Sequence, residues 1–243
     1  MTYCVALRLR DGLVLLSDTR TTAGVDHIST FSKMHLFDVP KDRVIAVLSA
    51  GNLAITQAVT NLLGEGLEFE GQTTTLQNVP SMFKAAQLVG AAVRQVFQTD
   101  GPQLGAQNIA FDASMLLAGQ IKGREMRLFQ IYAAGNFIEA TEDTPFLQIG
   151  EHKYGKPILD RAVTYDMDLF DAVKLALISM DSTLRSNLTV GPPLDLLVYR
   201  KDSYEIAVQR RIGENDDYYR MIGKSWSEAL RDAYRAIPRP KWD

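Results

Sequence analysis

The chain has 243 residues, of which 46% are hydrophobic, so it is long enough to bury a sizeable core within one large domain. Its 26 Lys and Arg residues face 29 Asp and Glu residues, which leaves no basic excess for nucleic-acid phosphates. No apolar run approaches the roughly 18 residues of a membrane span, and with no secretory signal and only one cysteine we expect a cytoplasmic protein with no membrane partner.

The chain opens with two strands that we expect to form a hairpin. Residues 2–9 alternate between apolar and other side chains, Asp11 and Gly12 supply a tight turn, and residues 13–18 read as the second strand. The alternation places one set of side chains on a single face of the first strand: Val5, Leu7 and Leu9. A hairpin of this kind brings the ends of its two strands close together.

Two further strands and two helices follow, and a similar order recurs in the second half. We expect strands over 34–39 and 44–51, a helix over 52–66 capped by Asn52, and a helix from Ser81 to Phe97, before the segment 100–108 interrupts the pattern. The second half carries strands over 114–119 and 127–133, helices near 154–162 and 169–184, and strands over 194–200 and 204–212.

This order of elements favours an α+β fold with two sheets packed face to face between layers of helices, a four-layer αββα sandwich. A doubly wound parallel sheet is the alternative, but it requires a helix between successive strands, whereas this chain begins with a hairpin. We place the main domain at residues 1–215. Residues 216–243 form a helical extension, with Ser225 and Glu228 as a capping box, that packs on its own domain or on a neighbouring subunit.

Metal and cofactor chemistry find little support in the sequence. The three histidines do not have the spacing of metal ligands, and one cysteine cannot build a thiolate cluster. No glycine-rich phosphate loop and no nucleophile elbow is present, although a Ser-His-Asp triad assembled by the fold stays open. We therefore expect neither a metal nor an organic cofactor.

The second residue offers a different chemistry. Met1 is normally removed when a small residue follows it, and Thr2 then carries both a hydroxyl nucleophile and a free α-amine. An α-amine titrates near pH 7.7 to 8, so part of it is neutral at pH 7 and can act as the base. A nearby cation would lower the amine's pKa, and a buried carboxylate would hold that cation. Asp18, at the end of the hairpin, and Lys33 fit these two roles.

Several motifs in this order resemble the proteasome β-subunits. They are Thr2 at the head of a strand, SDTR with Asp18 and Arg20, Lys33 in FSKMHLF, and SAG ending at Gly51. The length, the segment IGEHKYGKPILDR and the long tail are most similar to the Anbu family of bacterial proteasome-like proteins. The resemblance implies an amino-terminal nucleophile (Ntn) hydrolase that assembles into rings or helical arrays, with Gly51 supplying its backbone N–H to an oxyanion hole. For Arg20 we expect a structural salt bridge.

The chain also departs from the proteasome pattern at two places. Where that pattern has a serine after a glycine, this chain has Glu151, which with His152 and Lys156 either lines the cleft or forms an ordinary helix entry. A later aspartate and serine are missing as well. The segment LRSNLTVGPP offers other hydrogen-bonding side chains in their place: Ser186, Asn187 and Thr189.

Three functions are compatible with these residues. The first is a threonine peptidase in a self-assembled homo-oligomer, acting on peptides or unfolded proteins, with any ATP-driven unfoldase supplied by a separate partner. The second keeps the nucleophile but acts on a small amide or a modified peptide. The third is a ring-forming scaffold with little or no catalysis, which the departures from the proteasome pattern motivate.

Overall fold

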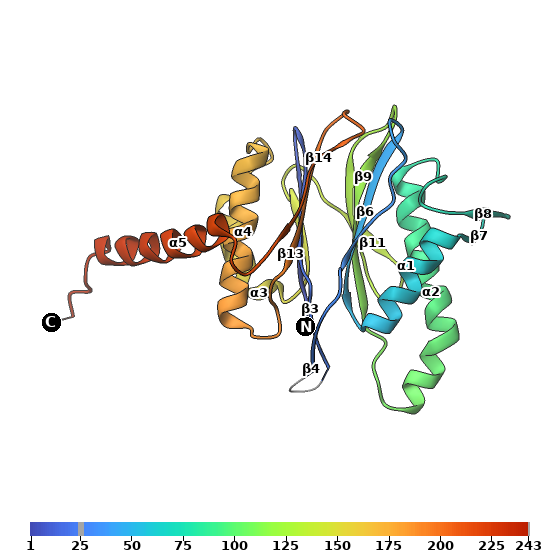
Figure 1. Ribbon diagram of the computed structural model, residues 1–243, viewed down its shortest axis with the longest axis horizontal. Helices are drawn as coiled ribbons and strands as arrows, with labels where there is room; N and C mark the ends of the chain where they lie inside the picture. Colours follow the sequence, from blue (N-terminus) through green and yellow to red (C-terminus); the bar gives the residue numbers. More distant parts are fainter. Residues whose placement is uncertain (24–26, 243) are drawn as a thin grey trace.

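The strands of the protein form two five-stranded antiparallel sheets packed face to face, as the computed structural model shows for residues 1–23 and 27–242 (Figure 1). The first sheet has the order β12 (Phe146–Gly150), β1 (Tyr3–Leu9), β2 (Gly12–Asp18), β13 (Leu194–Arg200) and β14 (Ile206–Ile212). The second has the order β11 (Phe137–Glu139), β10 (Arg127–Ile131), β9 (Ala113–Ile121), β6 (Arg43–Gly51) and β5 (Met34–Leu36).

Helices cover the outer face of each sheet, so the expected αββα sandwich is confirmed (Figure 1). On the second sheet lie α1 (Leu53–Glu65) and α2 (Met82–Ala106), and on the first lie α3 (His152–Ala162) and α4 (Leu169–Ser186). Two small hairpins complete the body: β3 (Arg20–Ala23) with β4 (His27–Thr30), and β7 (Leu67–Phe69) with β8 (Gln72–Thr74). No helix in the described part of the chain is long and apolar enough to cross a membrane.

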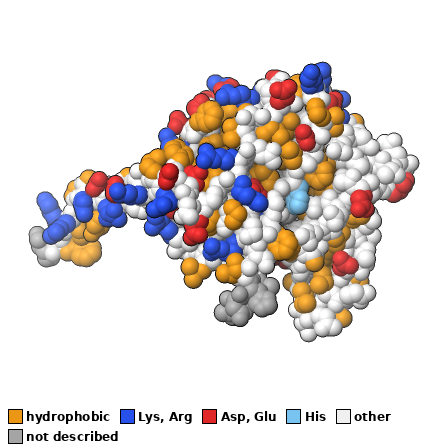
Figure 2. Space-filling view, in the orientation of Figure 1, with side chains coloured by type: hydrophobic (Ala, Val, Ile, Leu, Met, Phe, Trp, Pro, Cys, Tyr) orange, Lys and Arg blue, Asp and Glu red, His pale blue; other side chains and the backbone are white. Residues whose placement is uncertain are grey.

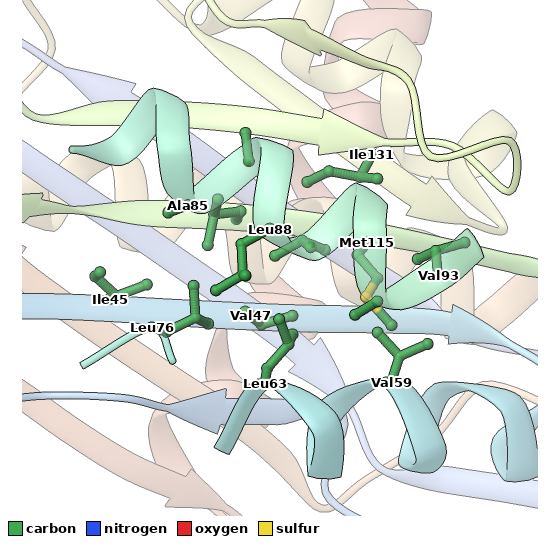
Figure 3. Close-up of a cluster of buried hydrophobic side chains, with 14 of the residues drawn as sticks. Ile45, Val47, Val59, Leu63, Leu76, Ala85, Leu88, Val93, Met115 and Ile131 are labelled. Atoms are coloured by element: carbon green, nitrogen blue, oxygen red, sulfur yellow. The ribbon is translucent and has the colours of Figure 1, made fainter. Parts of the chain in front are cut away.

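Three layers of buried apolar side chains hold the four structural layers together. One lies between the two sheets, one between the first sheet and α3 and α4, and one between the second sheet and α1 and α2 (Figure 3). The strand β1 is shielded on both faces, which is why nearly all of its residues are buried. Val5, Leu7 and Leu9 share one face, as predicted, and this face meets the helices, whereas Cys4 and Ala6 point between the sheets.

The expected opening hairpin is present. In the register of β1 and β2, Cys4 lies opposite Ser17, and the Tyr3 backbone N–H donates to the Asp18 side chain. On its other side β1 pairs with β12, which places Tyr3 opposite Gly150. The amino terminus is therefore held between a strand from early in the chain and one from its second half.

Two expectations about helix ends were wrong. The helix α2 continues through Pro102 to Ala106, because Leu104 packs against the apolar cluster on the second sheet and tertiary contact outweighs the local signal. The last helix, α5 (Asp217–Ala236), begins at the Asp216 cap, whose carboxylate accepts the Tyr219 N–H. Ser225 therefore lies inside the helix, and the expected capping box does not form.

The helix α5 projects away from the sandwich (Figures 1 and 2). Near its start, Tyr219 and Ile222 are buried against the first-sheet core beside α4. Farther along, Leu230 is 51% exposed and Tyr234 is 77% exposed. The distal part of the helix thus presents apolar side chains without packing on its own domain.

Candidate active site

Thr2 lies immediately before β1 and is held by the turn that leads into α3. The side chain and backbone of Thr2 together are 8% exposed, and the Glu151 N–H donates to the Thr2 carbonyl over 2.7 Å. Gly150 has a φ of +80°, and a Cβ at this position would overlap the same carbonyl. Only glycine allows this close approach, so Gly150 fixes how the turn meets the amino terminus.

Asp18 lies beside Thr2, and its carboxylate accepts hydrogen bonds from three residues around the site. One oxygen accepts the Tyr3 N–H at 3.1 Å and the Lys33 Nζ at 2.7 Å, and the other accepts the Gly191 N–H at 3.2 Å. The residue is 0% exposed. A buried carboxylate of this kind needs such partners, because an unpaired buried charge is strongly unfavourable.

Lys33 is the cation expected beside this carboxylate. It is 4% exposed, and its Nζ also donates to the Arg20 carbonyl at 2.7 Å. Burial raises the pKa of Asp18 above its ordinary value, while Lys33 and the two backbone N–H donors oppose that rise. The sequence placed Asp18 and Lys33 next to Thr2, and the structure brings the three residues together.

The α-amine of Met1, which directly precedes Thr2 in this structure, has a pKa below its ordinary value. Burial is the main cause, and the positive charge of Lys33 acts in the same direction. The negative charges of Asp18 and Glu151 act in the opposite direction. In this environment an α-amine is more easily neutral near pH 7 than it is in water.

A cleft of about 990 Å³ opens beside Thr2. Gly51, at the end of β6, lies on its wall with a φ of +116°, and a Cβ there would overlap the Asp112 carbonyl. The wall draws on both sheets and on the turn into α3, and its polar side chains include Asn52, Asp112, Ser114, Gln130, Asp143, Gln148, Glu151, His152, Lys156 and Asp160.

Among the described residues Arg20 makes no salt bridge, although we expected one, and its guanidinium contacts the loop after α4 instead. Its Nη1 donates to the Leu188 carbonyl at 2.9 Å, and its guanidinium packs so closely on Gly191 that a Cβ there would overlap it. Gly191 in turn donates its N–H to Asp18. Arg20 therefore supports the loop that reaches the buried carboxylate.

Ser186, Asn187 and Thr189 belong to the same loop but lie outside the cleft wall as far as the structure describes it. Ser186 is the last residue of α4, and Asn187 follows it as the C-cap. The Asn187 Oδ1 accepts the Thr189 backbone N–H at 3.0 Å and the Thr189 hydroxyl at 2.6 Å. Asn187 and Thr189 thus shape the loop that carries Gly191, and among the described residues neither forms a hydrogen bond with Thr2.

Sequence reasoning missed two glycines that position the site, Gly150 and Gly191. Both act through their backbones, and their partners are more than 140 residues away in the chain. It also missed Ser114 and Gln130, which reach the cleft from the second sheet. The sequence QIGE signalled a tight backbone conformation at Gly150. No local sequence signal indicated Gly191, Ser114 or Gln130.

Other side chains near Thr2 are poorly suited to nucleophilic or metal chemistry. Cys4 is 0% exposed, and burial raises the pKa of its thiol, so the reactive thiolate is disfavoured. Within residues 1–23 and 27–242, no group of three or more His, Cys, Asp or Glu side chains is arranged to hold a metal ion. The Thr2 hydroxyl, the nucleophile predicted from the sequence, lies at this cleft.

Comparisons with known proteins agree with this architecture. The profile of the family described as "Proteasome subunit" matches residues 2–198. The solved structure of Anbu (ancestral beta-subunit) from Yersinia bercovieri is 52% identical, with a TM-score of 0.91 over 99% of this chain and 100% of that one. The helical assembly of the Anbu complex from Pseudomonas aeruginosa is 48% identical, with a TM-score of 0.90 over 98% of each chain. The proteasome subunit beta type-2 of Saccharomyces cerevisiae is 26% identical over 81% of this chain and 68% of its own.

Proposed function

The chain belongs to the proteasome subunit family and, within it, to the Anbu proteins, and we propose that it is a threonine peptidase whose nucleophile is the amino-terminal Thr2 after removal of Met1. The observation that carries the proposal is the buried pair of Asp18 and Lys33 next to Thr2 at the wall of a large cleft. These are the groups that a hydroxyl activated by its own α-amine requires.

The reaction proceeds through an ester on Thr2. The α-amine takes the hydroxyl proton while the Thr2 Oγ1 attacks the carbonyl carbon of the substrate, and the Gly51 N–H stabilises the oxyanion that forms. The amine then gives the proton to the departing amino group of the substrate as the C–N bond breaks. Water, deprotonated by the same α-amine, attacks the ester and releases the acid, which restores Thr2.

Lys33 and Asp18 make the α-amine usable as a base. In the unprocessed chain the positive charge of Lys33 lowers the pKa of the Met1 amine, and we expect it to act in the same direction on the Thr2 amine once Met1 is removed. Asp18 holds the ammonium in place through a 2.7 Å contact. Because both residues are buried, water screens these charges weakly.

The size of the cleft favours peptides over small amides as substrates. Its volume of about 990 Å³ lies at the upper end of the range for ligand pockets, roughly 300–1,000 Å³. Its wall offers many hydrogen-bonding groups along its length, as an extended peptide backbone requires. A small amide would leave most of these groups to water.

The first test is the state of the amino terminus. We expect the untagged protein, purified from its native host, to have lost Met1 by intact-mass measurement, and the processed protein to hydrolyse fluorogenic peptides faster than single amino-acid amides. Hydrolysis of the small amides alone would favour an amidohydrolase. Retention of Met1 in the assembled protein would contradict the proposal, because the amine would then be locked in a peptide bond, and would favour a scaffold.

We also propose that the protein assembles with copies of itself through α5. The helix projects from the sandwich and presents Leu230 and Tyr234 to solvent in the protomer. Exposed apolar side chains along one helix are typical of protein interaction sites. The related Pseudomonas aeruginosa protein is a helical assembly, which supports self-association as the use of this surface.

Leu230→Asp is expected to weaken self-association at least ~10-fold, because it places a charge in an apolar contact. Folding of the protomer should be unchanged, since Leu230 is exposed there. Size-exclusion chromatography with light scattering, over a range of protein concentrations, measures the effect. Arg231→Ser, an equally exposed change at the next position, is the matched control. An unchanged mass distribution for Leu230→Asp would show that α5 is not the interface.

A further inference from the structure

The carboxylate of Glu151 is buried at the cleft wall without a matching hydrogen bond. Its side chain is 14% exposed, and among the described residues its Oε2 has no hydrogen-bond partner. The Lys153 Nζ lies 3.5 Å from this oxygen, an ion pair made by a side chain that is itself 65% exposed. Although Glu151 occupies the N-cap position of α3, its side chain does not cap the helix. Buried polar atoms in proteins normally have a hydrogen-bond partner, so the unpaired Oε2 requires an explanation.

The position of Glu151 relative to Thr2 is fixed by the backbone. The Glu151 N–H donates to the Thr2 carbonyl, and Gly150 permits that contact. In the unprocessed chain Glu151 is also one of the charged groups that act on the amino group of Met1, the residue before Thr2. Its carboxylate and the nucleophile therefore share one end of the cleft.

The α-amine of Thr2 needs an acceptor once Met1 has been removed. Asp18 is poorly available, because its two oxygens already accept hydrogen bonds from Tyr3, Lys33 and Gly191. An ammonium group has three donors, and burying it without an acceptor is unfavourable. The Glu151 Oε2, which has no hydrogen-bond partner among the described residues, offers an acceptor at the same cleft wall as Thr2.

We propose that Glu151 is a positioning residue that accepts a hydrogen bond from the α-amine of Thr2 and sets the pH at which this amine becomes a base. The inference rests on the proposed function. Glu151 and Lys33 act in opposite directions: the carboxylate favours the protonated amine and the ammonium favours the neutral one. The carboxylate therefore holds the amine by a hydrogen bond, and the ammonium keeps the pKa of the amine from rising too far.

Other charged groups also face the amine, and the test must separate them from Glu151. Asp18 and Lys33 are paired with each other. Lys153 pairs with Glu151 itself, and other titratable side chains line the cleft: Asp112, Asp143, His152 and the ion pair of Lys156 with Asp160. Asp143 is exposed to solvent, so its charge is screened more than that of Glu151.

Glu151→Gln tests the proposal because it keeps the shape and the backbone contact but removes the charge. The full-length protein is released from a cleavable fusion so that Thr2 is its first residue, and reductive methylation of the α-amine with ¹³C-formaldehyde is followed by mass spectrometry from pH 5 to 9. Without the carboxylate the amine is neutral at lower pH. We expect the labelling rate at pH 6.5 to rise about threefold, and the ratio of peptidase activity at pH 6 to that at pH 9 to rise similarly.

Asp143→Asn is the matched control, since it removes a carboxylate from the same cleft, and it should leave the labelling curve close to that of the wild type. A Glu151→Gln curve that coincides with the wild type, or that shifts no more than the control, would overturn the role of Glu151. The two proposals fail in different ways. A shifted titration in a protein without any Thr2-dependent hydrolysis would refute the peptidase, and Thr2-dependent hydrolysis with an unshifted titration would refute only the role of Glu151.

Discussion

Thr2→Ala is expected to abolish amide hydrolysis, with a loss of at least ~10³-fold, while the protein still folds and assembles. The change removes the proposed attacking oxygen, and the neighbouring Cys4 thiol cannot replace it, because that thiol is buried and its pKa is raised. The backbone contact of residue 2 with Glu151 is kept, since it uses the carbonyl. Alanine is also small, so Met1 removal should proceed as before.

Thr2→Ser is the companion variant, because it keeps both the hydroxyl and the α-amine. We expect it to retain measurable hydrolysis. The wild type and both variants are compared by peptidase assay, intact mass and light scattering. These measurements distinguish a loss of hydrolysis from a loss of Met1 removal or of assembly. Undiminished hydrolysis by correctly processed Thr2→Ala would exclude Thr2 as the nucleophile.

Asp18→Asn is expected to reduce both stability and activity. Asparagine has nearly the same shape but leaves the Lys33 ammonium, which is 4% exposed, without its anionic partner. Breaking one side of a buried ion pair lowers the free energy of unfolding by about 3–5 kcal/mol. Hydrolysis should fall at least ~10²-fold, because Lys33 is no longer held beside the amine. Urea unfolding at a fixed protein concentration and peptidase assays measure the two effects.

Combining this change with Lys33→Met separates the two effects. The double variant contains neither charge, so it should recover much of the lost stability, since an apolar replacement of a buried pair is often nearly neutral. Its activity should stay low, because the amine has lost the cation that lowers its pKa. A fully active double variant, or Asp18→Asn with wild-type stability and activity, would show that the pair plays neither role.

Local sequence patterns predicted the elements that are determined by their own residues. The opening hairpin, the cap of α1 at Asn52 and the alternation in β1 follow from turn chemistry, capping and periodicity. The end of α2 was wrong because a tertiary contact of Leu104 keeps the helix going past Pro102. The start of α5 was wrong because two capping signals compete and Asp216 comes first.

The same distinction applies to the site. Asp18 was placed beside the first residues because one tight turn connects their strands, and this contact is present. The contacts of Gly150, Glu151 and Gly191 depend on how β12 and the loop after α4 return to the amino terminus, which no local pattern specifies. The catalytic roles of Thr2, Asp18, Lys33 and Gly51 stay predictions until the variants are measured.

The contacts that hold Thr2 have a consequence for the growing chain. The Thr2 carbonyl accepts a hydrogen bond from the N–H of Glu151, and the Asp18 carboxylate accepts one from the N–H of Gly191. Both donors are synthesised long after their acceptors. A nascent polypeptide therefore contains Thr2 from the beginning of synthesis, but the contacts around it are complete only when about four fifths of the chain has been made and has folded back. The order of synthesis thus makes the candidate site one of the last features of the fold to be completed.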